Sequence, residues 1–133
     1  MASIFTRIIA GELPSYRIFE DEHTFAFLAR DALAHGHTLI VPKVEINDFT
    51  DVPEPYYSAV FRNARPIAQA LKAAAGCVRV GTVIAGFEVP HFHLHLIPIN
   101  RPQDLEMANA KVRANEEFLY WQKKICDELA RPA

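Results

Sequence analysis

The sequence predicts an α+β fold, in which a mostly antiparallel sheet of about five strands packs against helices. Residues 91–98 alternate between polar and apolar side chains, which is the period of a half-buried strand. Apolar, β-branched runs at residues 38–41 and 78–84 indicate further strands. A stretch that ends at Gly76 carries apolar residues at helical spacing over several turns, which indicates one long helix.

Length and composition fit one domain over residues 1–133, with a core at about 3–98 and a C-terminal loop and helix at 99–131. The formal net charge is −2 and lysines and arginines do not cluster, so we expect no nucleic-acid partner. Arg7 and Glu12 interrupt any signal peptide, and no apolar run reaches membrane-spanning length. We therefore expect a cytoplasmic protein without a membrane partner.

The N-terminal segment predicts a short helix and a hairpin. Residues 4–10 place apolar side chains at helical spacing, with Ser3 as the cap and Gly11 as the end. Residues 16–19 and 24–28 are expected to be two strands joined by a charged turn.

Three more strands are expected. Residues 38–41 follow His37, and residues 78–84 lead through a loop into the last strand, which we expect to begin at His91.

The long helix is expected to start near Pro53 and Pro55, because proline is tolerated in a first helical turn. The candidate caps are Thr50 and Asp51. Pro66 removes a backbone donor inside the helix, which predicts a kink or break near residues 62–65.

A polar connection over residues 99–113 precedes the last helix, for which Asn115 is the expected cap. Glu116 and Glu117 would then lie at the positive end of the helix dipole. The apolar stripe of this helix consists of Phe118, Trp121, Ile125 and Leu129.

His91, His93 and His95 should line one face of the last strand. Each buried imidazole nitrogen needs a partner, so a water-exposed face, metal binding and group transfer are the three interpretations. Same-face residues are about 6.5 Å apart, so a neighbouring pair can share a zinc ion but three in line hardly can. The row suits a central nucleophile with a helper on each side, because imidazole attacks phosphorus near neutral pH.

This row, followed by two apolar residues, resembles the signature of the histidine-triad family of nucleotide hydrolases and transferases. Residues 4–22 resemble the family's amino-terminal stretch, residues 36–43 its fourth-histidine strand, and residues 85–89 the approach to the triad. The resemblance covers roughly residues 3–98 in the family's order. It implies a histidine-triad fold with a long central helix and a C-terminal helix, and a homodimer.

The resemblance also implies roles for individual residues. His93 matches the nucleophile, which attacks the α-phosphorus and holds a nucleotidyl group while a backbone carbonyl accepts its other ring hydrogen. His95 matches a residue that bonds phosphate oxygens, and His37 and His91 match the supporting network. Gly86 matches a glycine whose small size lets the backbone approach the phosphate.

Four apolar residues match the positions that sandwich the nucleotide base, although composition alone makes them core residues equally well. They are Phe5, Ile8, Leu13 and Phe27. The family's ribose-binding acidic residue is replaced by Ala29, and Asp31 would have to point inward to substitute for it.

A carboxylate stands where the family commonly has a hydroxyl, because Phe87 and Glu88 replace its Gln-Ser or Gln-Thr pair. Glu88 is a candidate general acid for the leaving group if burial raises its pKa. Otherwise its negative charge would repel phosphates.

Many bacterial relatives hold a structural zinc with two cysteines, a histidine and the first triad histidine. The matching positions here are Ser3, Thr6 and Glu45, and hydroxyls are poor zinc ligands, so we predict no metal and no cofactor. Cys77 and Cys126 are expected to be unpaired thiols, and a disulfide between them is the alternative.

The function expected from the resemblance is two-step nucleotidyl transfer on a purine-type nucleotide. Nucleoside phosphoramidates, acyl nucleotides or dinucleoside polyphosphates would form nucleotidyl-His93, which water would hydrolyse. One alternative is a nucleotide-binding sensor or scaffold with little turnover, and another is a metalloenzyme that uses two triad histidines.

Overall fold

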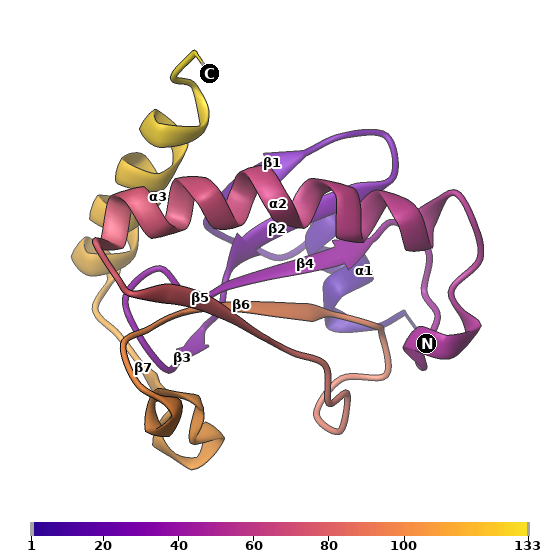
Figure 1. Ribbon diagram of the computed structural model, residues 1–133. Coiled ribbons are helices and arrows are strands. Elements are labelled where there is room, and N and C mark those ends of the chain that lie inside the picture. The colour runs from indigo at the N-terminus through magenta and orange to yellow at the C-terminus, as the bar shows by residue number, and fades with distance from the viewer. Residues whose placement is uncertain (1, 133) are drawn as a thin grey trace.

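Five strands form one antiparallel sheet in the order β1-β2-β4-β6-β5 (Figure 1). The strands are β1 (Arg17–Glu20), β2 (Thr24–Leu28), β4 (Thr38–Pro42), β5 (Arg79–Val83) and β6 (Leu94–Ile99). The structure, a computed structural model, describes residues 2–132. It confirms the predicted α+β class and the five-stranded antiparallel sheet.

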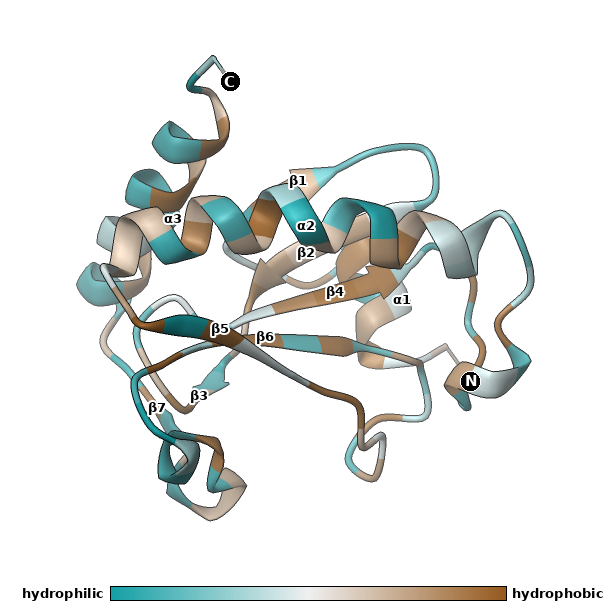
Figure 2. Ribbon diagram, viewed as in Figure 1, coloured by the Kyte–Doolittle hydropathy of each residue, from teal (hydrophilic) through white to brown (hydrophobic). Residues whose placement is uncertain are grey.

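Helices cover both faces of this sheet. The long helix α2 (Tyr56–Ala75) lies along one face, next to α3 (Asn115–Leu129), while α1 (Ile4–Ile9) lies behind the sheet in Figure 1. Figure 2 shows that α2 alternates between hydrophilic and hydrophobic segments, as expected for a helix with one buried side. None of the helices in the described part of the chain combines the length and hydropathy of a membrane span.

Alternation along the strands divides the core into two clusters. On the α2 side, Leu28 and Ile40 pack with Leu71. On the α1 side, Phe27 and Leu39 pack with Phe5. The two clusters follow from the period of two along each strand, which sends neighbouring side chains to opposite faces.

The long helix differs from its prediction at its start and in its middle. Thr50 and Asp51 lie in a separate 3-10 turn capped by Asp48, so neither caps α2, whose prolines delay its start until Tyr56. The predicted break is wrong, because α2 continues through Pro66. Pro66 lies on the exposed side, where water can bond the carbonyl that lost its amide partner.

The connection after β6 is more ordered than predicted. It contains 3-10 turns at Pro102–Leu105 and Met107–Asn109 and a short strand β7 (Lys111–Val112). β7 pairs with another two-residue strand, β3 (Asp31–Ala32), and forms a second small sheet. Segments of two residues show no periodicity, which is why the sequence did not reveal them.

The predicted cap of α1 is confirmed and that of α3 is wrong. The Ser3 side chain accepts a hydrogen bond from the Thr6 amide at the start of α1. At α3, Ala114 occupies the cap position and Asn115 is the first helical residue. The Asn115 side chain instead accepts a hydrogen bond from the Tyr16 hydroxyl, which ties α3 to the segment before β1.

Glu116 and Glu117 lie in the first turn of α3, as predicted. Cys77 and Cys126 are free thiols, so the disulfide alternative is wrong.

Gly36 sits directly before His37 in a left-handed conformation with φ of +87°. A Cβ atom there would come within 2.7 Å of Cδ1 of Leu71, which is fully buried. Gly11 has a similar φ of +81°, but a Cβ atom there would meet no other atom within 4 Å. Alanine at Gly11 would therefore introduce backbone strain alone, whereas alanine at Gly36 would add crowding to a similar strain.

We predict that Gly11→Ala lowers the free energy of unfolding by about 1 kcal/mol, the cost of a left-handed alanine. Gly36→Ala should cost about 1 to 3 kcal/mol more, because a buried leucine must also move. Urea unfolding of both variants measures the difference. Equal losses in the two variants would contradict the crowding at Gly36.

Candidate active site

His91, His93 and His95 lie together on the face of the sheet that is opposite α2. Their exposed fractions are 0%, 3% and 6%, and the intervening Phe92 and Leu94 belong to the core beneath α2. The alternation is therefore as predicted, but the strand is not, because β6 begins only at Leu94. The amide of Phe92 donates to the carbonyl of Ile46 in a loop, so residues 91–93 run beside a loop and not beside a strand.

His93 has one ring nitrogen in a hydrogen bond, and no other residue within 2–132 forms a hydrogen bond with the second nitrogen. Its Nδ1 lies 2.7 Å from the carbonyl oxygen of His91. A carbonyl oxygen only accepts, so Nδ1 carries the hydrogen and donates it. In the neutral ring Nε2 then holds a lone pair, and Oε2 of Glu88 lies 3.9 Å from it. Such a nitrogen is a potential nucleophile.

His95 has the opposite arrangement. The amide of Leu33 donates to Nδ1 of His37 over 3.0 Å, so the His37 hydrogen must be on Nε2. That Nε2 lies 2.9 Å from Nδ1 of His95, which therefore accepts, and the His95 hydrogen lies on its own Nε2. Among the described residues this buried Nε2 has no partner. It is a donor available to an anionic ligand.

His91 is held at both ring nitrogens. Its Nε2 donates to the carbonyl of Pro42 over 2.9 Å, and its Nδ1 accepts from the Ser3 hydroxyl over 2.8 Å. Oε1 of Glu45 accepts from the Ser3 amide at 2.6 Å and from the Thr6 hydroxyl at 2.7 Å. This cluster anchors the start of α1 to the segment before β6.

The same cluster contains Ser3, Thr6 and Glu45, which the resemblance in the sequence matched to zinc-ligand positions. It offers the hydroxyls of Ser3 and Thr6, the carboxylate of Glu45 and an imidazole whose two nitrogens are already bonded. Zinc in structural sites prefers thiolate and imidazole ligands, so these donors do not fit a zinc ion.

Burial keeps the supporting histidines neutral. It lowers the pKa of His37 to about 3, with further lowering from the charges of His95 and Arg113. It lowers the pKa of His95 to about 4, with further lowering from the charge of His93 and opposition from the Glu88 carboxylate. Burial also lowers the pKa of His91. Neutral rings are what the hydrogen-bond directions above require.

Of the four residues matched to base contacts, the structure gathers three near His93. The ring of Phe5 lies 5.0 Å from that of His93 and 5.5 Å from that of Phe27, and Ile8 packs on the same cluster. Leu13 is half-buried and is not part of this cluster as the structure describes it. Phe5 and Phe27 are both buried, so only Ile8 and Leu13 expose substantial surface to a ligand.

The ribose position lacks a carboxylate. Ala29 is 4% exposed, and Asp31 lies on the exposed side of β3, so it does not point inward to substitute. Gly86 has a φ of +83°, and a Cβ there would meet no atom within 4 Å. The conformation, and not crowding, requires a glycine at this position, and the space beside it is open.

Glu88 does not meet the condition set for a general acid. Its side chain is 65% exposed, so the burial on which that hypothesis depends is absent. Its carboxylate lies 3.9 Å from Nε2 of His93, at the exposed side of the site.

A family model described as the HIT domain matches residues 10–101. The chain is 39% identical over 100 residues to Protein hit from Bacillus subtilis, which covers 71% of this chain and 69% of that protein. It is 36% identical over 98 residues to adenosine 5′-monophosphoramidase HNT1 from Saccharomyces cerevisiae, over 73% of this chain and 62% of that protein.

Solved structures show the same fold. A Hit-like protein involved in cell-cycle regulation from Bartonella henselae superposes with a TM-score of 0.85 at 28% identity, over 95% of both chains. A zinc-bound histidine triad family protein from Mycobacterium smegmatis superposes with a TM-score of 0.81 at 27% identity, over 98% of this chain and 94% of that one.

The lowered histidine pKa values predict how stability depends on pH. Below pH 6.5 an unfolded chain binds protons on His37 and His95, whereas in the folded chain the pKa of His37 is about 3 and that of His95 is about 4. Stability should therefore fall as pH falls from about 6.5 to about 4, by up to about 1.4 kcal/mol per pH unit for each histidine. Denaturant midpoints across this range measure the slope.

His37→Gln should flatten that slope because it removes one of the two groups. His35→Gln is the matched control, since His35 lies in the same loop but stacks on Trp121 outside the network. The same slope in both variants would contradict the assignment of a neutral buried His37.

Proposed function

The chain belongs to the histidine-triad (HIT) family, and on that premise we propose that it is a nucleotide hydrolase or nucleotidyl transferase that acts through a covalent nucleotidyl group on His93. Its substrates are purine nucleoside phosphoramidates, acyl nucleotides or dinucleoside polyphosphates. The observation that carries the proposal is the free lone pair on Nε2 of His93, held by the hydrogen bond from Nδ1 to the His91 carbonyl. Similarity to a monophosphoramidase supports the phosphoramidate class.

In the first step the lone pair on Nε2 of His93 attacks the α-phosphorus, and the bond from phosphorus to the leaving group breaks. The leaving group departs with the bonding electron pair and takes a proton from solvent. The imidazole ring becomes positively charged, and its Nδ1 hydrogen stays bonded to the His91 carbonyl, which stabilises that charge.

In the second step water attacks the phosphorus and the bond to Nε2 of His93 breaks. The electron pair returns to Nε2, a proton from the water passes to solvent, and a nucleoside monophosphate leaves. In both steps Nε2 of His95 donates to a phosphoryl oxygen, because it is a buried donor without another partner in the described chain.

The remaining two histidines of the site, His37 and His91, act as positioning residues. His37 fixes the tautomer of His95 through its Nε2 hydrogen, and His91 fixes that of His93 through its carbonyl. Gly86 leaves open space for the phosphoryl group. The base lies against the α1 side of the site, where it contacts Ile8 and Leu13. The buried rings of Phe5 and Phe27 lie behind these contacts.

The same proposal includes a homodimer built through α2 and β5. β5 is an edge strand of the five-stranded sheet, and its side chains are half-buried or exposed. Phe61 on α2 is 39% exposed and Val78 before β5 is 62% exposed. Apolar side chains beside a sheet edge without a neighbouring strand suit a symmetric pair.

Mass spectrometry after mixing with an adenosine phosphoramidate tests the enzyme. We expect an adenylyl adduct on His93, no adduct in His93→Ala, and a loss of turnover of roughly 10³-fold or more in that variant. Native spectra of the same samples should show the mass of two chains.

Three results would contradict parts of this proposal. Binding without adduct or product would favour a nucleotide sensor or scaffold. Turnover that a chelator abolishes would favour a metalloenzyme. A native mass of one chain would reject the dimer alone.

A further inference from the structure

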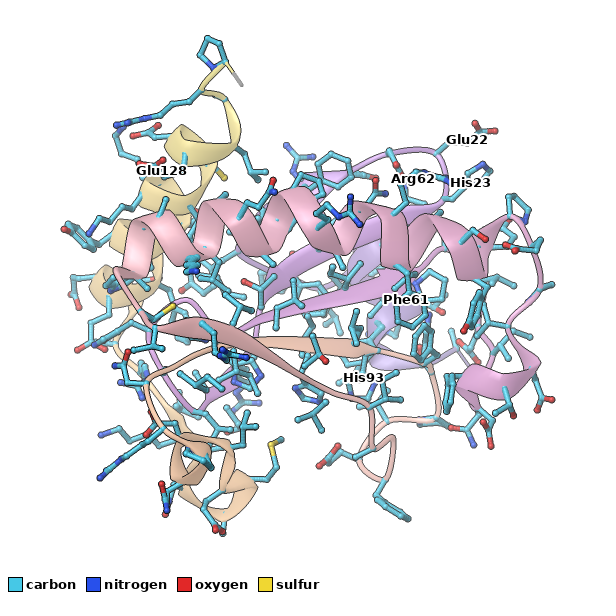
Figure 3. The ribbon with its side chains drawn as sticks, viewed as in Figure 1. Glu22, His23, Phe61, Arg62, His93 and Glu128 are labelled. Carbon is cyan, nitrogen blue, oxygen red and sulfur yellow. The ribbon has the colours of Figure 1, made fainter. Side chains whose placement is uncertain are left out.

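Glu88 places a negative charge in front of the nitrogen that must receive an anion. Its Oε2 lies 3.9 Å from Nε2 of His93, and its side chain is 65% exposed whereas that of His93 is 3% exposed. The carboxylate therefore lies on the solvent side of the nucleophile. Figure 3 labels His93 at the end of the loop that joins β5 to β6, and the same loop carries Glu88.

A phosphoryl group bonded to Nε2 would hold its oxygens within a few ångströms of this carboxylate, and like charges at that separation repel one another. The neighbouring histidines do not compensate, because burial lowers the pKa of His95 and of His37 and leaves both rings neutral. These two rings thus contribute hydrogen bonds but no positive charge to the site.

We propose that Glu88 makes the site selective for nucleotides whose leaving group carries a positive charge close to the bond that breaks. This inference rests on the proposed function and specifies its substrate class: nucleoside phosphoramidates or acyl phosphates of compounds with a further ammonium group. The ammonium of the leaving group pairs with the Glu88 carboxylate. Its positive charge then offsets the repulsion between that carboxylate and the phosphate.

The residue beside Glu88 supports an organic leaving group. Phe87 is 95% exposed, the largest exposed fraction among the large apolar side chains. An apolar ring next to a carboxylate suits a leaving group with a carbon chain and a cationic end. A metal ion would need further ligands, and among the described residues no group of three or more histidine, cysteine, aspartate or glutamate side chains is placed to hold one.

Three adenosine phosphoramidates of matched length test the inference: those of ethylenediamine, ethanolamine and β-alanine, whose leaving groups end in an ammonium, a hydroxyl and a carboxylate. We expect kcat/KM to fall in that order, by about fivefold at each step for a partly exposed charge. In Glu88→Gln the three values should converge. Glu116→Gln removes an exposed carboxylate on α3 and should keep the order.

Equal kcat/KM values in the wild-type protein, or an unchanged order in Glu88→Gln, would overturn the inference. So would an order that disappears with a chelator, since a metal ion would then supply the charge. Binding of the same compounds to His93→Ala reads the preference without turnover. A binding preference with no turnover in the wild type would reject the proposed hydrolase but keep the selectivity of Glu88.

Discussion

The hydrogen bond from Nδ1 of His93 to the carbonyl of His91 is the constraint on which the site depends. It decides which nitrogen of a neutral imidazole keeps its lone pair. The carbonyl is itself immobilised, because the His91 ring is bonded at both nitrogens and the adjacent Phe92 is 1% exposed in the core. Packing of Phe92 in the core between α2 and the sheet therefore helps to fix the carbonyl that bonds Nδ1 of His93.

A second backbone group sets the neighbouring imidazole in the opposite tautomer. The amide of Leu33 fixes His37, and His37 fixes His95, whose ring lies 5.1 Å from that of His93. One ring thus presents a lone pair and the next presents a hydrogen. A nucleophile and a donor for developing negative charge can be neighbours without a positive charge on His95, since burial keeps that ring neutral.

The sequence predicted the parts of this structure that depend on periodicity. The alternation at the triad and the apolar runs predicted the sheet, and the helical stripe predicted α2, because burial on one side imposes a period on many residues. The caps predicted for α2 and α3 were wrong, since a cap depends on one residue and its local geometry. The pairing of β3 with β7 was missed, since two residues show no period.

The candidate site was predicted only as a set of residues. The tautomers of His93 and His95 could not be predicted, because they depend on the Leu33 amide and on a contact between residues 58 positions apart. The sequence identified Ser3 and Glu45 only as positions that lack zinc ligands, and it did not predict the hydrogen bond between them. The exposure of Glu88 depends on how the loop before β6 is placed, so the sequence could not show that the burial expected of a general acid is absent.

Nitrogen-15 NMR of the histidine side chains at neutral pH tests the central claim most directly, because protonated and unprotonated ring nitrogens have well-separated chemical shifts. The account predicts that His93 has its hydrogen on Nδ1 and a bare Nε2, while His95 has its hydrogen on Nε2 and a bare Nδ1. A His93 ring with its hydrogen on Nε2, or one that exchanges freely between the two forms, would contradict it.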